Sequence, residues 1–563
     1  MSLNGLPDDY FIFLENGKRL YGDDTYARIN VAKIKRIEIL NGASSALYGT
    51  NAIGGVINII TDDVKNAINV SSDTRYASKG RFTQSVNIDV NTGKFGSYTS
   101  YRRQQAEGWQ LNPYEENSKT HELEETGKVA STGFYANTVN QKFTFDATDK
   151  LSFYARGGYY DNKTRRPYEA YDYNILHETF NYGIGAQYMI NKGNYITADC
   201  YADHFSSSYC FFKDNKTYNG KAGEEQVRKR TRNHNLSIKG IFKLGNRHKL
   251  SVGTEYIVDV LKSQTDNIAK EDAYTLALFA QDEIKLLRNL QALIGVRYIY
   301  HENFKNHATP NVALMYKPGK FNFRASYAAG FRTPTLSELY ATDIAKKNDR
   351  LTIGNLDLKP EKNNYFSLSA EYVHERFSVS VNAFYNNIRD MIDYNTIATG
   401  DKAMEQYGHK EVRQRDNIAE AKVHGINVSA NAYLGAGFNL SGGYTHLNTQ
   451  DVELEQPIDK SIKNAYNINA QWAHSWKIYR LNINLNGRFN SKRFSKSYGY
   501  APEYQLWDLN TRHSFNLKSV IIEPGCGMEN LFDYMDDRPY NSNYATLTPG
   551  RSFYISLSLK FKS

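Results

Sequence analysis

From about residue 66 to the end of the chain, apolar and polar side chains alternate along many short stretches. The last stretch is the clearest, with an apolar set that shares one parity: Phe553, Ile555, Leu557, Leu559 and Phe561. A period of two places successive side chains on opposite faces of a β-strand. Each stretch is about ten residues long, the length of a tilted strand that crosses a bilayer. We therefore expect a series of transmembrane strands.

Short turns and long polar segments alternate between these stretches. The short turns lie at 91–94, 147–150, 191–194, 245–248, 287–289, 317–320, 374–376, 435–437, 476–479 and 517–519. Long polar segments, such as 205–232, 330–362 and 386–421, lie between them. Two strands around each turn and one at each end give about 22 strands, an even number typical of outer-membrane barrels. We predict an all-β membrane barrel with short turns on one rim and long loops on the other.

Closure of this sheet follows from physical chemistry as well as from the pattern. An open sheet edge in lipid would leave unpaired N–H and C=O groups, each costing several kcal/mol. A soluble propeller or sandwich array is the alternative, and it would repeat similar sequence in each unit. The chain has periodic architecture without repeated sequence, which favours the membrane barrel.

The composition agrees with a barrel that has a single apolar face. Apolar residues are only 40% of the 563 residues and the mean hydropathy is −0.62, yet there are 44 Tyr and 28 Phe. A wide barrel with a wet lumen needs apolar side chains only on its lipid face and in aromatic belts. No stretch reaches the roughly 18 consecutive apolar residues of a transmembrane helix.

The charge and the cysteines exclude several other classes. The net charge is +9, but Lys and Arg are scattered among acidic residues, so we expect no nucleic-acid partner. Such a surface suits anionic lipid headgroups or anionic solutes. Cys200, Cys210 and Cys526 lack zinc spacing, and we expect no bound metal or resident cofactor. Cys200 and Cys210 form either a loop-closing disulfide or two unpaired thiols.

A glycine-punctuated run, RIEILNGASSALYGTNAIGGVINIIT, spans Arg36 to Thr61. A nucleotide-binding loop would need Gly-x-Gly-x-x-Gly or Gly-x-x-x-x-Gly-Lys-Ser/Thr at a helix start, because its N–H groups must converge on phosphate. Neither pattern is present, no Lys follows the glycines, and the run ends in a predicted strand. We therefore exclude a phosphate-binding loop.

The same run carries a family resemblance. LPDDYFIFLENGKR, followed by RINVAKIKRIEILNGASSALYGTNAIGGVINIIT, resembles the second half of the plug domain of TonB-dependent outer-membrane receptors. The resemblance implies a partial α+β plug at 1–63 inside the lumen of a barrel formed by 66–563. Its plug motif corresponds here to Gly42, Tyr48, Gly49, Gly54, Gly55 and Asn58. These glycines would allow tight turns and close backbone approach.

Several barrel segments agree with this resemblance. FRTPTLSELY, GNLDLKPEK, NLFDYMDDRPY and PGRSFYISLSLKF are similar to the family's conserved boxes, so that the resemblance covers nearly the whole chain. It implies uptake of a scarce, bulky solute across the outer membrane of a Gram-negative bacterium. The implied partners are membrane lipids, the solute and the TonB–ExbB–ExbD complex that supplies energy.

Arg36 and Glu38 match plug positions that, in the family, help to hold the plug to the barrel wall through ion pairs. Charges that face a lumen wall are partly desolvated and need partners. The alternative is that both are exposed strand residues. We expect a contact between these two residues and the barrel.

The start of the sequence departs from the family pattern. No basic segment followed by an apolar segment and a cleavage site is visible, so we see no signal peptide. The resemblance also implies a first half of the plug and a TonB box before residue 1. We expect the sequence to begin inside a longer coding frame, and a passive pore or an inactive barrel is the alternative to active transport.

The cargo expected from the resemblance is an iron complex, in the order ferric siderophore, then haem, with cobalamin third. Haem iron takes His or Tyr ligands, and no His lies between the FRTPTLSELY and GNLDLKPEK boxes. We interpret the scattered histidines as solvated loop residues: His121, His177, His204 and His409. His301 and His307 form a pair in sequence, and we expect a structural role for them.

Candidate ligand-binding residues are aromatic or basic. Anionic aromatic chelates suit Tyr and Arg through charge-assisted hydrogen bonds and cation–π contacts. The candidates are Phe331, Arg332, Tyr171, Tyr173, Tyr209 and Phe211. Cobalamin would need an apolar bowl, which aromatic loop residues also fit. The alternative for these aromatic residues is a girdle around the rim.

Two other classes compete with a receptor. An outer-membrane enzyme would show a catalytic constellation on its rim, and Gly-x-Ser-x-Gly is absent from the sequence. We therefore expect no enzyme. A passive porin is disfavoured by the plug motif, provided that the plug segment occludes the lumen.

Overall fold

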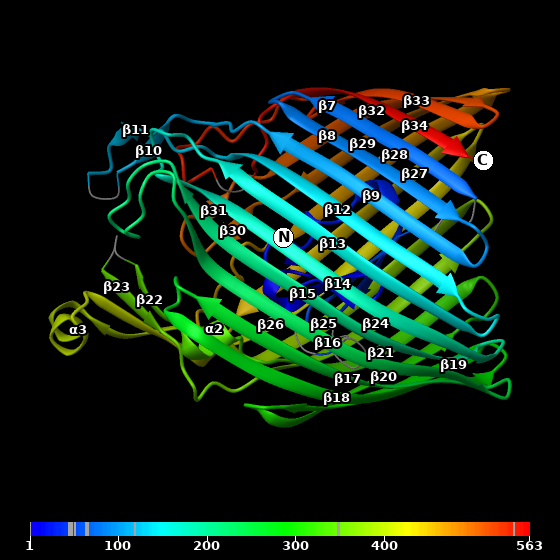
Figure 1. Cartoon of the computed structure of the whole chain (residues 1–563), viewed down its shortest axis with the longest axis horizontal. Coiled ribbons are helices and arrows are strands. Elements are labelled where there is room, and N and C mark those ends of the chain that lie inside the picture. Colours follow the sequence, from blue (N-terminus) through cyan, green and yellow to red (C-terminus); the bar gives the residue numbers. More distant parts are fainter. Residues whose placement is uncertain are drawn as a thin grey trace.

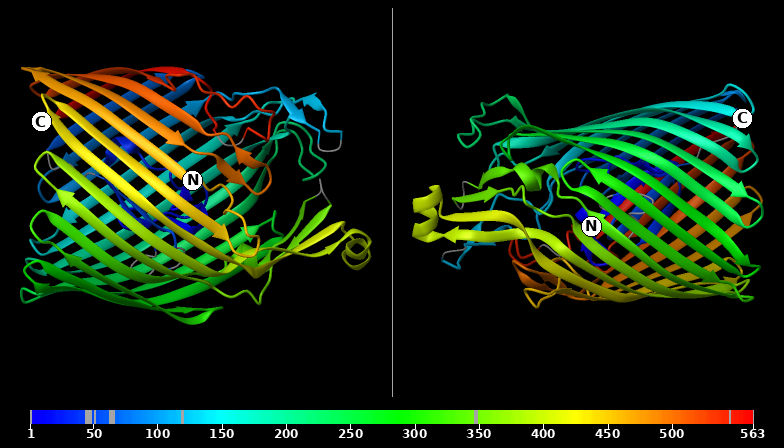
Figure 2. Two further views of the ribbon diagram at one scale, coloured as in Figure 1. Left: turned by 180° about the vertical axis from the view of Figure 1, so that it is seen from behind. Right: turned by 90° about the horizontal axis from the view of Figure 1, so that it is seen from below.

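The computed structural model describes residues 2–42, 49, 52–61, 67–117, 120–345, 349–543 and 546–562. These residues form a small N-terminal sheet inside a large closed barrel (Figure 1, Figure 2). None of the helices in these ranges is long and apolar enough to cross a membrane.

The barrel is a closed antiparallel sheet of 22 strands within the described ranges. Its first half comprises β7 (Ile68–Ala77), β8 (Arg81–Asn91), β9 (Phe95–Ala106), β12 (Gly133–Asp146), β13 (Leu151–Arg165), β14 (Tyr173–Asn191), β15 (Asn194–Phe211), β16 (Glu225–Leu244), β17 (His248–Ser263), β18 (Ile268–Leu287) and β19 (Leu290–His301). Its second half comprises β20 (Lys305–Tyr316), β21 (Phe321–Arg332), β24 (Glu361–Val373), β25 (Phe377–Thr399), β26 (Glu411–Gly435), β27 (Phe438–Asp451), β28 (Asn464–Trp476), β29 (Tyr479–Asn490), β32 (Tyr504–Leu517), β33 (Val520–Glu529) and β34 (Ser552–Lys562). The last strand pairs with the first, with Tyr554 opposite Ala77, and this pairing closes the barrel.

The alternation read from the sequence is confirmed on β34. Its apolar residues are 41–66% exposed on the outer surface, where lipid would cover them. On the opposite parity, Lys560 bonds Glu523 at 2.6 Å, and the Arg75 guanidinium lies 4.0 Å from the Tyr554 ring. All ten predicted short turns lie at junctions between consecutive strands. These junctions gather at one rim, on the right in Figure 1.

The strands are longer than the predicted ten residues. They run from 10 residues in β7 to 25 in β26, and β25 has 23. Segment 386–421, predicted as a loop, is largely strand because β25 and β26 continue to pair beyond the other strands. The helix α3 (Gly400–Tyr407) connects the two strands at their tip. A hairpin of β22 (Thr342–Ala345) and β23 (Arg350–Ile353) extends this sheet, because β23 pairs in parallel with β26. This projection stands out at the left of Figure 1.

The rim of long loops carries three smaller elements. These are the hairpin β10 (Tyr114–Glu116) with β11 (Leu123–Glu125), the hairpin β30 (Arg493–Ser495) with β31 (Gly499–Ala501), and the helix α2 (Leu336–Tyr340). The two rims therefore differ as the sequence predicts.

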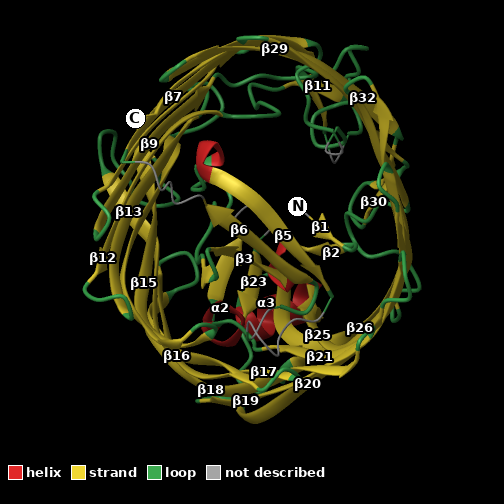
Figure 3. Ribbon diagram, turned by 90° about the vertical axis from the view of Figure 1, so that its right-hand side faces the viewer, coloured by secondary structure: helices red, strands yellow, loops and turns green. Residues whose placement is uncertain are grey.

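The N-terminal segment forms a plug inside the barrel, which Figure 3 shows from the rim of short turns. Its elements are β1 (Ser2–Leu3), β2 (Leu6–Pro7), η1 (Asp8–Tyr10), β3 (Phe11–Glu15), β4 (Lys18–Arg19), η2 (Val31–Lys33), β5 (Ile34–Asn41) and β6 (Gly55–Thr61). The sheet order is β4-β3-β6-β5, with β3 and β6 parallel. Alternate residues of β3 feed two apolar clusters, one with Ile29 and Ile59 and one with Ala52 and Val56.

Two further predictions from the sequence concern the domain boundary and the cysteines. The predicted domain boundary at 63–66 falls among residues 62–66, outside the described residues; β6 ends at Thr61 and β7 begins at Ile68. Cys200, Cys210 and Cys526 are free thiols. The disulfide alternative is wrong, because Cys200 and Cys210 lie ten residues apart on the same strand, β15, whereas bridged Cα atoms lie within about 7 Å.

Candidate functional site: plug anchors and an aromatic cluster at the loop rim

Ion pairs hold the plug against one side of the barrel. The pairs, plug residue first, are Glu15–Arg156 at 3.7 Å, Lys18–Asp199 at 2.6 Å, Asp23–Lys229 at 3.7 Å, Asp24–His177 at 2.7 Å, Arg28–Asp203 at 3.1 Å and Lys33–Asp89. Their barrel partners come from β8, β13, β14, β15 and β16. Barrel carboxylates at 89, 199 and 203 and the plug cations at 18, 28 and 33 therefore form one interface of complementary charge.

The pair between Arg28 and Asp203 is the most buried of these contacts. The two side chains are 5% and 0% exposed. Arg28 donates from one nitrogen to both carboxylate oxygens at 3.1 Å, and the Tyr21 N–H donates to Asp203 at 3.0 Å. A buried charge needs such multiple partners to offset its desolvation.

Asp24 forms a neighbouring anchor. Its carboxylate contacts His177 Nδ1 at 2.7 Å and accepts a hydrogen bond from the Asn162 amide at 3.1 Å. Burial by itself would raise the pKa of Asp24, but the hydrogen bonds and charge of these partners outweigh it and lower the pKa. His177 was predicted to be a solvated loop residue; that prediction is wrong, because it lies on β14 and binds the plug.

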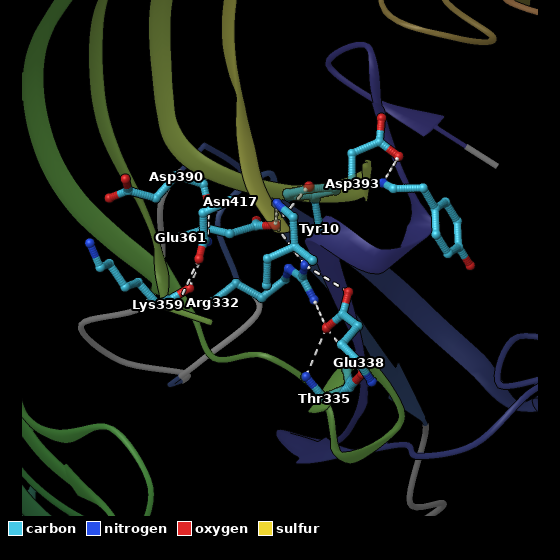
Figure 4. A network of polar contacts seen from close by, with 11 residues as sticks. Tyr10, Arg332, Thr335, Glu338, Lys359, Glu361, Asp390, Asp393 and Asn417 are labelled. Carbon is cyan, nitrogen blue, oxygen red and sulfur yellow. Dashed lines mark hydrogen bonds and ion pairs between the residues drawn. The ribbon is translucent and has the colours of Figure 1, made fainter. Parts of the chain in front are cut away.

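A second connection joins the plug to the loop rim through a buried network (Figure 4). Arg332 ends β21 and is 4% exposed. Its guanidinium donates to Glu338 at 3.0 and 3.1 Å and to Glu361 at 2.6 Å. The Tyr10 hydroxyl of the plug donates to the same Glu361 at 3.2 Å. One carboxylate thus receives donors from the plug and from the barrel wall.

Glu361 also receives a backbone donor. The Ile392 N–H donates to it at 2.9 Å, and β25 is bulged between Ile388 and Ile392. A bulge turns backbone groups away from the ladder, so this N–H is free for the carboxylate. Burial and the negative charge of Glu361 raise the pKa of Tyr10 well above its usual value, which keeps its hydroxyl a donor.

The local sequence explains how Glu338 is positioned. Thr335 caps α2, and its hydroxyl accepts the Glu338 N–H at 3.2 Å, while the Glu338 carboxylate accepts the Thr335 N–H at 2.8 Å. This capping box satisfies two helix-end donors. Burial alone would raise the pKa of Glu338, but the charge and hydrogen bonds of Arg332 lower it.

Arg332 and Phe331 were predicted to contact ligand, and the structure places both inside the wall. Phe331 is 2% exposed, packs with Ala277 and Ile299, and stacks on His307 at 5.1 Å. Arg332 is enclosed by its two carboxylates. These residues therefore connect α2 to the plug instead of lining an open ligand surface.

Arg36 and Glu38 were predicted to contact the barrel, and the structure places them elsewhere. They lie on β5, the edge strand of the plug sheet, with side chains 55% and 38% exposed. Arg36 bonds Glu38 at 2.7 Å, and the Asn58 amide donates to Glu38 at 3.0 Å. Because β5 faces open lumen, the two charges pair with each other within the plug. In the described part of the plug, the residues that form ion pairs with the barrel precede β5 in the chain.

The plug-motif glycines serve close approach and turns. Gly42 has φ of +80°, and a Cβ there would lie 2.3 Å from the Tyr365 ring of β24. Gly55 has φ of +143°, and its Cβ would lie 2.4 Å from the Leu40 carbonyl oxygen. No L side chain fits either position without displacement.

The remaining motif positions are less uniform. Gly54 donates to the Tyr10 carbonyl at 2.7 Å, and Gly49 lies against the Arg297 side chain. Asn58 is 6% exposed and accepts the Gly17 N–H at 3.0 Å, which ties β6 to the β3–β4 turn. Tyr48 lies outside the described residues.

Four aromatic side chains gather where β14 and β15 meet the long loops. Tyr173 and Tyr209 stack with ring centroids 4.1 Å apart, and Tyr218 meets their edges at 5.8 and 5.1 Å. Phe211 lies 5.6 Å from Tyr173. On β14, Tyr173 has the same parity as His177, which binds the plug, so that the cluster faces the lumen side of the wall.

Two arginines flank these rings. The Arg166 guanidinium lies 4.7 Å from the Tyr171 ring and 5.1 Å from the Tyr173 ring, and that of Arg228 lies 5.3 Å from Tyr209. Neither arginine has a carboxylate within 4.0 Å in the described part of the chain. We call Arg166, Tyr171, Tyr173, Tyr209, Phe211, Tyr218 and Arg228 the rim cluster. Four of its members, Tyr171, Tyr173, Tyr209 and Phe211, were predicted from the sequence, whereas the two arginines and Tyr218 were not.

His121, His204 and His409 were also predicted to be solvated loop residues, whereas a structural role was predicted for His301, and the four differ in the structure. His121 pairs with Glu116 in an exposed loop, and His409 pairs with Asp349 near α3. His204 lies within β15, 5.2 Å from the His234 ring. The Nδ1 of His301 accepts the Asn303 N–H at 3.1 Å in the turn before β20. Over the described ranges, no group of three or more His, Cys, Asp or Glu side chains is arranged to hold a metal ion.

The family model for the TonB-dependent receptor-like β-barrel matches residues 69–523, and that for the TonB-dependent receptor plug domain matches residues 1–56. The chain belongs to the TonB-dependent receptor family. Membership assigns it to the outer membrane and to a class of receptors and transporters, not of enzymes.

Solved structures with the same fold include two receptors and one transporter. The ferric enterobactin receptor PfeA of Pseudomonas aeruginosa has a TM-score of 0.83 at 17% identity, covering 99% of this chain and 91% of that chain. The siderophore receptor PirA of Acinetobacter baumannii has a TM-score of 0.79 at 16% identity, with coverages of 99% and 91%. The FrpB iron transporter of Neisseria meningitidis has a TM-score of 0.76 at 13% identity, with coverages of 100% and 93%. At these identities the likeness establishes the fold alone.

Proposed function

We propose that this TonB-dependent receptor takes up an anionic, aromatic ferric chelate, a ferric siderophore, with energy from the TonB–ExbB–ExbD complex. The observation that carries the proposal is the rim cluster. Its stacked tyrosines offer ring faces, and its two arginines lack carboxylate partners within the described residues. The structural similarity to the ferric enterobactin receptor PfeA and to the siderophore receptor PirA supports the same cargo class.

The chemistry of the rim cluster suits such a cargo better than haem or cobalamin. A tris-catecholate ferric complex is a trianion with three aromatic rings. The rings stack on tyrosine faces, while guanidinium groups bond the oxygens and offset the charge. Cobalamin is bulky and carries less negative charge, so it gains little from Arg166 and Arg228. Haem would need an iron ligand from His or Tyr, whereas the rim-cluster tyrosines contact each other.

Binding to purified receptor tests the proposal. We expect a hexadentate ferric tris-catecholate to quench tryptophan fluorescence saturably, and a neutral ferric trihydroxamate, haem and cobalamin to bind at least tenfold more weakly. The double variant R166Q/R228Q removes both cations and is expected to weaken tris-catecholate binding by tenfold or more.

The matched control is R415Q. Arg415 lies 3.6 Å from the Tyr394 ring on the β25–β26 projection, which is the same pair of residue types outside the rim cluster. Its loss should leave the affinity within twofold of the wild type. Tight binding of cobalamin or haem without binding of the ferric chelate would refute the proposed cargo. Uptake that persists after a protonophore collapses the inner-membrane gradient would refute the energy coupling.

A further inference from the structure

A basic pocket lies at the other end of the barrel, at the rim of short turns. It has a volume of about 600 Å³ and is lined by strands β16 to β21 and by the turn between β16 and β17. Its cationic residues are Lys243, Arg247, Lys249, Lys285 and Arg324. The only carboxylate that lines it in the described residues is Glu283. We call these six side chains, with the space they enclose, the exit pocket.

The exit pocket opens on the lumen side of the wall. A separate cavity of about 240 Å³ lies between the plug and strands β15 to β19. Its barrel side is lined by two cations, Lys239 and Arg297, and by three carboxylates, Asp199, Glu255 and Asp259. Every second residue of a β-strand has its side chain on the same face of the sheet. Lys239 and Lys243 of β16 are four positions apart, and Glu255 and Lys249 of β17 are six positions apart, so the two members of each pair lie on the same face. The exit pocket therefore shares the lumen face with the plug cavity.

Most of the charge in the exit pocket is uncompensated. Lys249 pairs with Glu283 at 2.8 Å. The other four cations, Lys243, Arg247, Lys285 and Arg324, have no carboxylate within 4.0 Å in the described ranges, although Arg324 contacts the Met315 sulfur at 3.3 Å. At the level of the plug, by contrast, Arg297 of the barrel is paired with Glu255, and Lys18 of the plug is paired with Asp199 of the barrel. Four unpaired cations around one space produce a positive potential that attracts anions.

We propose that the exit pocket is an anion-binding site on the periplasmic side, which receives the anionic iron complex after it passes the plug. The inference rests on the proposed function for the cargo. The plug cavity and the exit pocket share strands β16 to β19. On these strands Lys239 and Arg297 of the plug cavity are matched by Glu255 and Asp259, whereas the cations of the exit pocket outnumber its carboxylate five to one. An anion leaving the plug cavity along this wall moves toward the less compensated charge.

Chemical footprinting of the wild-type receptor tests the site directly. In detergent both rims are open to solutes, so that a probe reaches the exit pocket without energised transport. We expect ferric tris-catecholate, a trianion, to slow acetylation of Lys243 and Lys285 by an N-hydroxysuccinimide ester by fivefold or more, measured by peptide mass spectrometry. Lys477 and Lys518, which lie in other turns of the same rim, should react at an unchanged rate. A neutral ferric trihydroxamate should protect none of the four.

A transport assay gives the second readout. The double variant K285Q/R324Q should lower the initial rate of ferric tris-catecholate uptake by cells about fivefold, with surface binding within twofold of the wild type. The matched control K477Q/K518Q should leave both unchanged. Equal acetylation of Lys243 and Lys285 with and without the trianion would overturn the site, even where R166Q/R228Q weakens binding as expected. Absence of any tris-catecholate binding would instead refute the proposed function, which separates the two failures.

Discussion

At the scale of single residues, one carboxylate connects the plug to the loop rim. Glu361 is fully buried and accepts from the Tyr10 hydroxyl, the Arg332 guanidinium and the Ile392 N–H. It stands 351 positions from Tyr10 in the chain, so that no local pattern reveals the contact. The motif around it was recognised in sequence, while its role follows only from these three donors.

Replacing Glu361 by Gln keeps the shape of the side chain and removes its charge. Arg332 would then keep only Glu338, and the buried network would lose about 3 kcal/mol. We expect the urea midpoint for protease cleavage within the plug to fall, while the heat-modifiable electrophoretic mobility of the barrel stays unchanged.

The control for this change is D272N, in an exposed pair where Lys270 and Asp272 lie 3.1 Å apart with side chains 57% and 50% exposed. Exposed pairs contribute about 0.2–1 kcal/mol, so that this midpoint should hardly move. Equal midpoints for E361Q and the wild type would mean that the network does not hold the plug.

Gly42 offers a second test at this scale. G42A adds a Cβ that would lie 2.3 Å from the Tyr365 ring, at a φ of +80°. We expect a loss of about 2 kcal/mol or more in the same plug assay, from steric displacement and backbone strain. Adding Y365A removes the ring but not the strain, so the double variant should lose less than the sum of the two single losses. Strict additivity would show that the Tyr365 ring is not what excludes a side chain.

At the scale of elements, the bulge in β25 is fixed by Asn417 of β26. The Asn417 amide donates to the Lys359 carbonyl at 2.9 Å and to the Asp390 carbonyl at 2.6 Å, and its oxygen accepts the Lys359 N–H at 2.7 Å. Asn417 therefore clamps the segment that leads into Glu361 to the bulge that supplies the Ile392 N–H (Figure 4).

N417A is expected to release this clamp. Hydrogen exchange at the Lys359 amide should accelerate by about tenfold or more, which corresponds to about 1.4 kcal/mol and to the loss of its acceptor. N417D keeps an acceptor oxygen and should protect this amide partly. N395A serves as the control, because Asn395 makes a hydrogen bond of 3.3 Å to Asp416 on the same two strands. Unchanged exchange in N417A would contradict the clamp.

Features of the elements that depend on residues close together in the chain could be predicted from the sequence. Turns such as 191–194 and the alternation in β34 were read correctly, because both depend on neighbours within a few residues. The extension of β25 and β26 was missed, because strand residues outside the membrane are polar on both faces and cannot be told from loop residues by their sequence pattern. The contacts of Arg332 were also missed, because the FRTPTLSELY motif identifies a family box but does not show which side chains enclose Arg332.

At the scale of the whole molecule, the plug is held from two directions. Ion pairs to β8 and β13–β16 fix one flank, and the Glu361 network fixes another near α2. The partners lie far apart in sequence, 175 positions for Arg28 and Asp203, so that only closure of the barrel brings them together. The rim cluster shares β14 and β15 with the first flank. A ligand that moves these strands would therefore act on the plug through His177 and Asp203.

The ionic flank should make plug attachment sensitive to acid. The folded pKa of Asp24 is lowered below its ordinary value of 3.8 by His177 and Asn162, against the opposing effect of burial. A carboxyl with a depressed pKa contributes stability that is complete above its ordinary pKa and is lost as the pH falls through the folded value. We expect the urea midpoint of the plug to be constant from pH 7 to 5 and to decrease below about pH 4.

D24N should remove part of this acid dependence and lower the midpoint at pH 7, because the charged partner of His177 is lost. The matched control is E116Q, which removes the carboxylate of another His pair, with His121, in an exposed loop away from the plug. It should reproduce the wild-type curve at every pH. If D24N also follows the wild-type curve, the contact with β14 contributes nothing to plug attachment. Strands β14 and β15 would then not connect the rim cluster to the plug.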